Sequence, residues 1–131
     1  MQDSKLATKT RLSTTDLENQ VVDAALEVHK NIGLGFGRQE YSSALAHELG
    51  LREIPFEKKK KAKLSYKGSV AGEYNLDFVV DNSLVIMITT DEQLAQTEES
   101  KLKSILRAVK LKMGLIINFS KDILEIKTVK Q

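Results

Sequence analysis

The fold of the chain is decided by the stretch from Glu73 to Thr90, which reads Glu-Tyr-Asn-Leu-Asp-Phe-Val-Val-Asp-Asn-Ser-Leu-Val-Ile-Met-Ile-Thr-Thr. Residues 73–80 alternate between polar and apolar side chains, as in a strand with one buried face. The next three residues, Asp-Asn-Ser, favour a tight turn. Residues 84–90 are almost all apolar, which indicates a strand buried on both faces. The stretch therefore predicts a β-hairpin at the middle of the chain.

Length and composition set the class of protein. The chain has 131 residues, of which 41% are hydrophobic and 29% are charged, as in one ordinary globular domain. We predict a single domain over residues 14–131, preceded by a flexible polar arm over residues 1–13. A net charge of +2 gives the whole molecule only a weak attraction for nucleic acid.

The residues that are missing exclude several kinds of chemistry. The chain has no cysteine, so disulfides, a thiolate nucleophile and cysteine-ligated zinc are excluded. Residues 1–15 lack the apolar run of a signal peptide, and no apolar run elsewhere is long enough to cross a membrane. We therefore expect a cytoplasmic protein that makes no membrane contact and needs no cofactor.

The rest of the chain adds helices on both sides of the hairpin. Thr15 and Glu18 have the spacing of a capping box, and apolar residues at three- and four-residue intervals extend the helix to Ile32. A second amphipathic helix is expected from Arg38 to Leu49, and a third from Asp91, with Gly50 and Gly114 as their ends. Strands are expected over residues 56–66, 70–80, 84–90, 115–119 and 123–129. The order is α, α, β, β, β, α, β, β, and the expected fold class is α/β (α+β), with a mixed sheet of about five strands and one long crossover helix.

Two groups of basic residues allow more than one interpretation. The run Lys58-Lys59-Lys60-Lys61 lies on the first strand, where lysines either neutralise phosphates or protect a sheet edge from pairing with other chains. Arg107 and Lys110 lie in the basic second half of the third helix, which is either a solvated face or a phosphate-binding face. Both groups are candidates for nucleic-acid binding.

Several motifs together resemble a known family. They are Ala-Ala-Leu-Glu-Val-His-Lys at residues 24–30, Gly-Leu-Gly at 33–35, Tyr41, Ala-Leu at 44–45, the hairpin around Asp77, and Gly-Leu-Ile-Ile-Asn-Phe at 114–119. In this order and spacing, residues 17–129 resemble the small bacterial GxxExxY proteins of the PD-(D/E)XK nuclease-like superfamily. The resemblance implies a restriction-endonuclease-like core.

The resemblance also implies where a catalytic site would lie. Active members of the superfamily hold Mg²⁺ with acids, because oxygen ligands suit this hard cation, and a lysine assists. Asp77 matches the acid of the hairpin. The glutamate and lysine of the next strand fall on Met87 and Thr89, the glutamate of Gly-x-x-Glu-x-x-Tyr falls on Arg38, and a glutamine of the later helix falls on Lys101.

These replacements predict a site that holds no metal. A thioether is a poor ligand for Mg²⁺, while Arg38 and Lys101 add positive charge where the metal ion would lie. We expect Asp77 to form a salt bridge with one of these cations instead. The leading hypothesis is a catalytically inactive nuclease-fold protein that acts through a protein partner or as a homo-oligomer. The alternatives are a nucleic-acid-binding module, and a metal-dependent nuclease with an unconventional set of residues.

Overall fold

A computed structural model describes residues 14–91 and 96–131 of the chain. The expected flexible arm over residues 1–13 lies outside the described residues. The elements follow in the order α2 (Thr14–Ile32), α3 (Arg38–Leu51), β1 (Phe56–Tyr66), β2 (Ser69–Val80), β3 (Leu84–Thr89), α4 (Gln96–Val109), β4 (Met113–Asn118) and β5 (Glu125–Lys130). This is the predicted order of helices and strands. No described helix is long and apolar enough to span a membrane.

The five strands form one mixed sheet, so the predicted fold class is confirmed. The strands lie in the order β1-β2-β3-β4-β5. The β3–β4 pair is parallel, while all other neighbouring pairs are antiparallel. A parallel pair needs a crossover connection, and α4 provides it. β1 and β5 are therefore the two edge strands.

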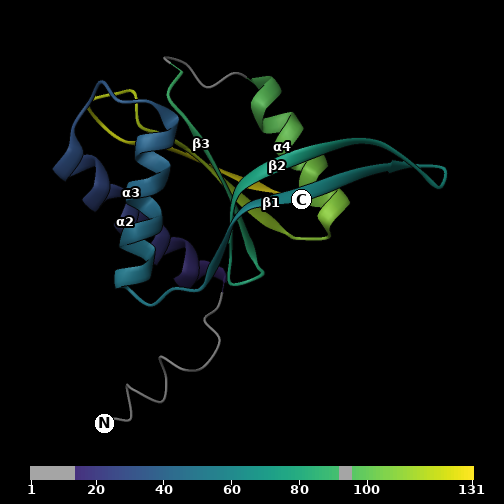
Figure 1. The fold of residues 1–131 in the computed structure, drawn as a ribbon, viewed down its shortest axis with the longest axis horizontal. Helices are drawn as coiled ribbons and strands as arrows, with labels where there is room; N and C mark the ends of the chain where they lie inside the picture. Colours follow the sequence, from purple (N-terminus) through teal and green to yellow (C-terminus); the bar gives the residue numbers. More distant parts are fainter. Residues whose placement is uncertain (1–13, 92–95) are drawn as a thin grey trace, which may run out of the picture.

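Helices cover both faces of the sheet. Helices α2 and α3 lie together on one side, and α4 lies on the other, as Figure 1 shows. The larger apolar cluster joins α2 and α3 to the sheet, and the smaller one joins α4 to it. In the larger cluster the Tyr41 ring stacks on Phe119, with 4.6 Å between ring centroids, and the Tyr41 hydroxyl donates to the Gly33 carbonyl oxygen at 2.6 Å. Tyr41 thus fixes the start of α3 against both the sheet and the α2–α3 turn.

The predicted hairpin is formed by β2 and β3. Asp81 and Asn82 both have positive φ angles, 50° and 51°, a conformation that aspartate and asparagine tolerate better than most residues. Five of the six β3 residues are buried, as expected from its apolar sequence. The turn chemistry and the apolar run therefore led to the correct pairing.

Pairing between β2 and β3 is short, and this shapes the molecule. The pairs run only from Val80–Leu84 to Phe78–Ile86. The remainder of β2 pairs with β1 alone among the described residues, and the two strands project from the body as a long arm (Figure 1). At the bend, Lys59 has a φ of 56°. The separation of β2 from β3 leaves space beside the end of β3.

The predicted ends of two helices need correction. Helix α3 continues through Gly50 to Leu51. The described part of α4 begins at Gln96, and the predicted cap at Asp91 precedes residues 92–95, which lie outside the described residues. The helix ends at Val109, where Lys110 takes a φ of 61°, and not at Gly114.

Gly114 belongs to β4 and serves helix packing there. A Cβ atom at this position would lie 3.0 Å from Cδ2 of Leu102 on α4. An added Cβ would therefore force the Leu102 side chain to shift by a few tenths of an ångström. Strand boundaries near this end also shifted by one or two residues: β4 ends at Asn118 and β5 begins at Glu125, and Ile123 is 84% exposed.

Replacing Gly114 with alanine tests the close approach of α4. We expect Gly114→Ala to lower the free energy of unfolding by about 1–3 kcal/mol, the usual cost of overpacking a filled core. The matched control is Gly72→Ala on β2, where an added Cβ would meet nothing within 4 Å. Urea denaturation should show a stability loss for the first variant and little change for the second, and equal stabilities would contradict the packing role of Gly114.

Candidate functional site

Asp77 lies where β2 separates from β3, and both of its carboxylate oxygens are bound. Oδ1 accepts a hydrogen bond from Nη2 of Arg38, at the start of α3, at 2.9 Å. Oδ2 accepts from the backbone N–H of Ile88 on β3 at 2.7 Å. The Asp77 side chain is only 16% exposed. The expected salt bridge between Asp77 and a replacing cation is therefore present, and the cation is Arg38.

The bond to Ile88 has a structural cause. Backbone pairing between β2 and β3 stops at Phe78 and Ile86, so the amide of Ile88 has no partner from the β2 backbone. A buried amide without an acceptor would cost free energy, and the Asp77 carboxylate takes the place of the missing strand. Asp77 thus closes the end of the hairpin.

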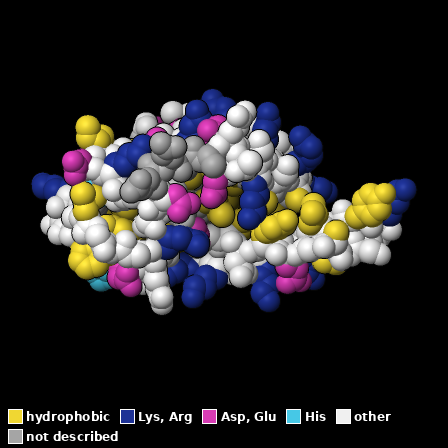
Figure 2. Space-filling model, turned by 90° about the horizontal axis from the view of Figure 1, so that it is seen from above, with side chains coloured by type: hydrophobic (Ala, Val, Ile, Leu, Met, Phe, Trp, Pro, Cys, Tyr) yellow, Lys and Arg dark blue, Asp and Glu magenta, His cyan; other side chains and the backbone are white. Residues whose placement is uncertain are grey.

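A cleft of about 410 Å³ lies beside this point. Its lining includes the four residues that stand where the resemblance would place catalytic residues, Arg38, Met87, Thr89 and Lys101. Figure 2 shows a face with a central hollow, where acidic, basic and apolar side chains lie next to one another. Sequence positions 38, 87, 89 and 101 are thus brought together as the resemblance implied.

Each replacing residue has a contact of its own. Lys101 places its Nζ 4.9 Å from the centre of the Tyr74 ring, a cation–π contact. Met87 is partly buried and packs against the α4-side cluster. Thr89 is buried, and its Oγ1 accepts from the backbone N–H of Asp91 at 3.1 Å. These side chains are thus engaged in packing and local hydrogen bonds.

The described residues of the cleft do not fit a magnesium site. Three further acids line the cleft, Glu73, Asp91 and Glu98. Over residues 14–91 and 96–131, however, no three acidic or histidine side chains lie close enough to hold one ion. The nearest cationic group to Asp77 is a guanidinium, which opposes a second cation by charge repulsion.

A polar cluster at the ends of β3 and β4 was missed by sequence reasoning. Asn118 is fully buried, and its Nδ2 donates to the Asp91 carbonyl oxygen at 2.7 Å and to Oε1 of Glu125 at 3.2 Å. Its Oδ1 accepts from the N–H of Ser120 at 2.9 Å. The hydrogen bond from Lys121 lowers the pKa of Glu125, and the bond from Asn118 adds to this. The sequence feature that could have indicated this cluster is Asn118, a polar residue at the end of the apolar run of β4.

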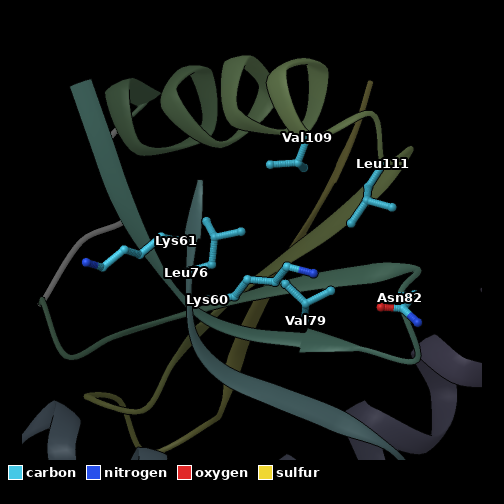
Figure 3. A pocket seen from close by; sticks show the side chains of 7 residues that line it. All are labelled: Lys60, Lys61, Leu76, Val79, Asn82, Val109 and Leu111. Carbon is cyan, nitrogen blue, oxygen red and sulfur yellow. The ribbon is translucent and has the colours of Figure 1, made fainter. Parts of the chain in front are cut away.

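The structure places the candidate nucleic-acid-binding residues on β1 and at the C-terminal end of α4. Lys58 lies over the Phe78 ring, with Nζ 5.8 Å from its centre, and Lys60 pairs with Glu57 at 3.1 Å. Lys60 and Lys61 line a separate hollow of about 270 Å³, where Val109 and Leu111 face Leu76 and Val79 (Figure 3). Because β1 is an edge strand, its lysines, Lys59 included, occupy the position where they oppose pairing with other chains.

Arg107 and Lys110 line an open hollow at the C-terminal end of α4, and its lining shares no residue with the cleft or with the hollow of Lys60 and Lys61. Val109 and Leu111, the chain neighbours of Lys110, line the hollow of Lys60 and Lys61, so the two hollows are adjacent.

Comparison with known proteins shows the family of the chain. No curated protein matches the chain. Among solved structures, the chain is similar to the crystal structure of SSO0001, with 15% sequence identity and a TM-score of 0.48 over 85% of this chain and 65% of the other. The chain thus spans less than two thirds of that protein. The sequence model of the PD-(D/E)XK nuclease superfamily matches residues 15–130. The chain belongs to the PD-(D/E)XK nuclease superfamily.

Proposed function

We propose that this protein is a nuclease-fold protein that does not cleave phosphodiesters and acts by binding, as a component of an assembly. The observation that carries the proposal is the state of Asp77, whose two oxygens are held by the Arg38 guanidinium and the Ile88 amide. A carboxylate that binds Mg²⁺ faces other oxygen ligands, whereas Oδ1 of Asp77 faces a guanidinium. Asp77 instead has the contacts of a structural residue.

Electrostatics supports the same proposal. The Arg38 guanidinium repels a divalent ion beside Asp77, and solvent weakens this repulsion because the Arg38 side chain is 58% exposed. The thioether of Met87 offers no compensating oxygen ligand.

The proposal includes membership of the narrower GxxExxY group, with a degenerate motif. Support comes from the spacing of Gly35, Arg38 and Tyr41, in which arginine stands at the position of the glutamate. Tyr41 keeps a structural role, since it stacks on Phe119 and binds the α2–α3 turn. Under this proposal the scaffold of the motif is retained and its acid is replaced.

The arm supports a role in binding another protein or a second copy of the chain. Three large apolar side chains near its tip are exposed: Leu64 by 40%, Tyr66 by 64% and Val70 by 56%. Exposed apolar side chains that gather on one projecting element are typical of interaction surfaces. The arm therefore provides a surface that a partner would cover.

The proposal predicts that the protein neither binds Mg²⁺ tightly nor cleaves nucleic acid. Calorimetric titration with Mg²⁺ and Mn²⁺ should show no tight site, because the described acids of the cleft do not come together as a set of three around one point. Incubation with single- and double-stranded DNA and RNA should leave the substrates intact. Tight metal binding together with cleavage that Asp77→Ala abolishes would sink the proposal.

A rebuilt acid pair is the matched positive control. The double variant Arg38→Gln/Met87→Glu removes the guanidinium that pairs with Asp77 and adds a carboxylate to the lining of the cleft. We expect Mn²⁺ binding to appear in this variant and to be lost again when Asp77→Asn is added. If the wild type and the double variant bind Mn²⁺ equally, the guanidinium is not what prevents metal binding.

The structural role of Asp77 gives a second prediction, in terms of stability. Asp77→Ala should lower the free energy of unfolding by about 1–3 kcal/mol, because it leaves the Ile88 amide without its acceptor. Arg38→Gln should cost at most about 1 kcal/mol, since the Arg38 side chain is 58% exposed and its ion pair is screened by solvent. Asp77→Asn keeps an oxygen that can accept from the Ile88 amide, so its loss of unfolding free energy should be close to that of Arg38→Gln. Chemical denaturation of the three variants gives the order, and a larger loss for Arg38→Gln than for Asp77→Ala would contradict it.

A further inference from the structure

The end of α4 carries a group of cations that is distinct from the cleft. Arg107, Lys110, Lys112 and Lys130 line one open hollow of about 740 Å³, together with Met113 and Gln131. All four cationic side chains belong to exposed residues, and no acidic residue lines the hollow. The cations come from α4, the turn after it and the edge strand β5, so the fold brings them together from separate parts of the sequence.

Among the described residues, the four cations of the hollow have no acidic partner, like most of the described lysines and arginines. Five described cations form ion pairs: Arg38, Arg52, Lys60, Lys121 and Lys127. Within the described residues, none of the four cations of the hollow is in an ion pair. Their charges therefore add, although the net charge of the whole chain is only +2.

The C-terminal end of a helix normally opposes anions, because its free carbonyl groups carry partial negative charge. Here Gln131 reduces this effect. Its Nε2 donates to the Leu111 carbonyl oxygen at 2.8 Å and to the Leu106 carbonyl oxygen at 3.3 Å. The Leu111 N–H also donates to the Leu106 carbonyl oxygen at 3.0 Å. The last turn of α4 thus has its carbonyl groups partly satisfied, which leaves the four cations to set the local field.

We propose that this hollow binds the phosphate groups of an extended polyanion, and that binding takes place here and not in the cleft. The proposal rests on the binding role proposed above and gives it a ligand chemistry and a place. Several fixed cations around one concave surface suit a chain with regularly spaced charges. A peptide would gain little apolar contact, because Met113 is the only apolar residue in the lining and is 9% exposed. The hollow thus offers positive charge but no apolar site for a peptide side chain, which favours phosphate groups over an acidic peptide.

The test is the salt dependence of binding to labelled single-stranded DNA, measured by fluorescence anisotropy between 50 and 200 mM salt. Four phosphate contacts predict a slope of about −2.8 in a plot of log K against log salt. The variant Lys110→Gln/Lys112→Gln loses two contacts and should give a slope of about −1.4. The matched control Lys30→Gln/Lys63→Gln removes the same charge from exposed residues of α2 and β1, outside the hollow, and should keep the wild-type slope.

Further binding experiments identify the chemistry of the ligand and the site at which it binds. Single-stranded RNA and inorganic polyphosphate should bind with the same dependence on Lys110 and Lys112, as expected for phosphate recognition. Three results would overturn the proposal: equal loss in the hollow and control variants, loss of binding in the cleft variant Lys101→Gln, or no measurable binding at 50 mM salt. Poly-glutamate that binds as well as polyphosphate would also overturn it, since phosphate would then have no advantage. Binding is measured without Mg²⁺, and cleavage is scored in parallel samples that contain Mg²⁺, so catalytic activity would contradict the proposed function without changing the measured slopes.

Discussion

The carboxylate of Asp77 connects three elements that otherwise diverge. It lies on β2, accepts from the backbone of β3 and pairs with the first residue of α3. β2 leaves β3 after only three paired residues, and a separation of this kind normally leaves unpaired backbone groups at the branch. The side chain of Asp77 satisfies one of them. The cleft lies where β2 separates from β3. The separation is tolerated because the Asp77 carboxylate accepts the hydrogen bond of the Ile88 amide.

The proposed function gives a structural role to a position that the resemblance assigns to a metal ligand. The resemblance puts the hairpin acid at Asp77, where β2 leaves β3 and the Ile88 amide needs an acceptor. In this chain Arg38 stands where the resemblance expects an acid, and the contacts of Asp77 are those of a structural residue.

Much of the fold follows from local features of the sequence. The alternation in β2, the apolar run of β3 and the Asp-Asn turn specify the hairpin, and its register follows from the turn. The positions of Arg38, Met87, Thr89 and Lys101 around one cleft followed from the family resemblance and from nothing local. The helix end at Gly114 was wrong because a glycine was interpreted by its effect on the backbone alone. Its actual role, close contact with Leu102, depends on a residue twelve positions away. The cluster at the end of α4 could not be predicted either, since Lys130 reaches it only through the pairing of β5 with β4.

The arm formed by β1 and β2 has a consequence for the order of folding. A short turn at Lys67 and Gly68 joins its strands, so this pairing needs little loop closure and is available early. The parallel contact between β3 and β4 brings together residues about thirty positions apart and requires α4 between them. The contact between Arg38 and Asp77 spans 39 positions and joins the helical pair to the hairpin. The arm would thus be complete while the cleft at its base is still unformed, and the cleft would be among the last parts of the molecule to take shape.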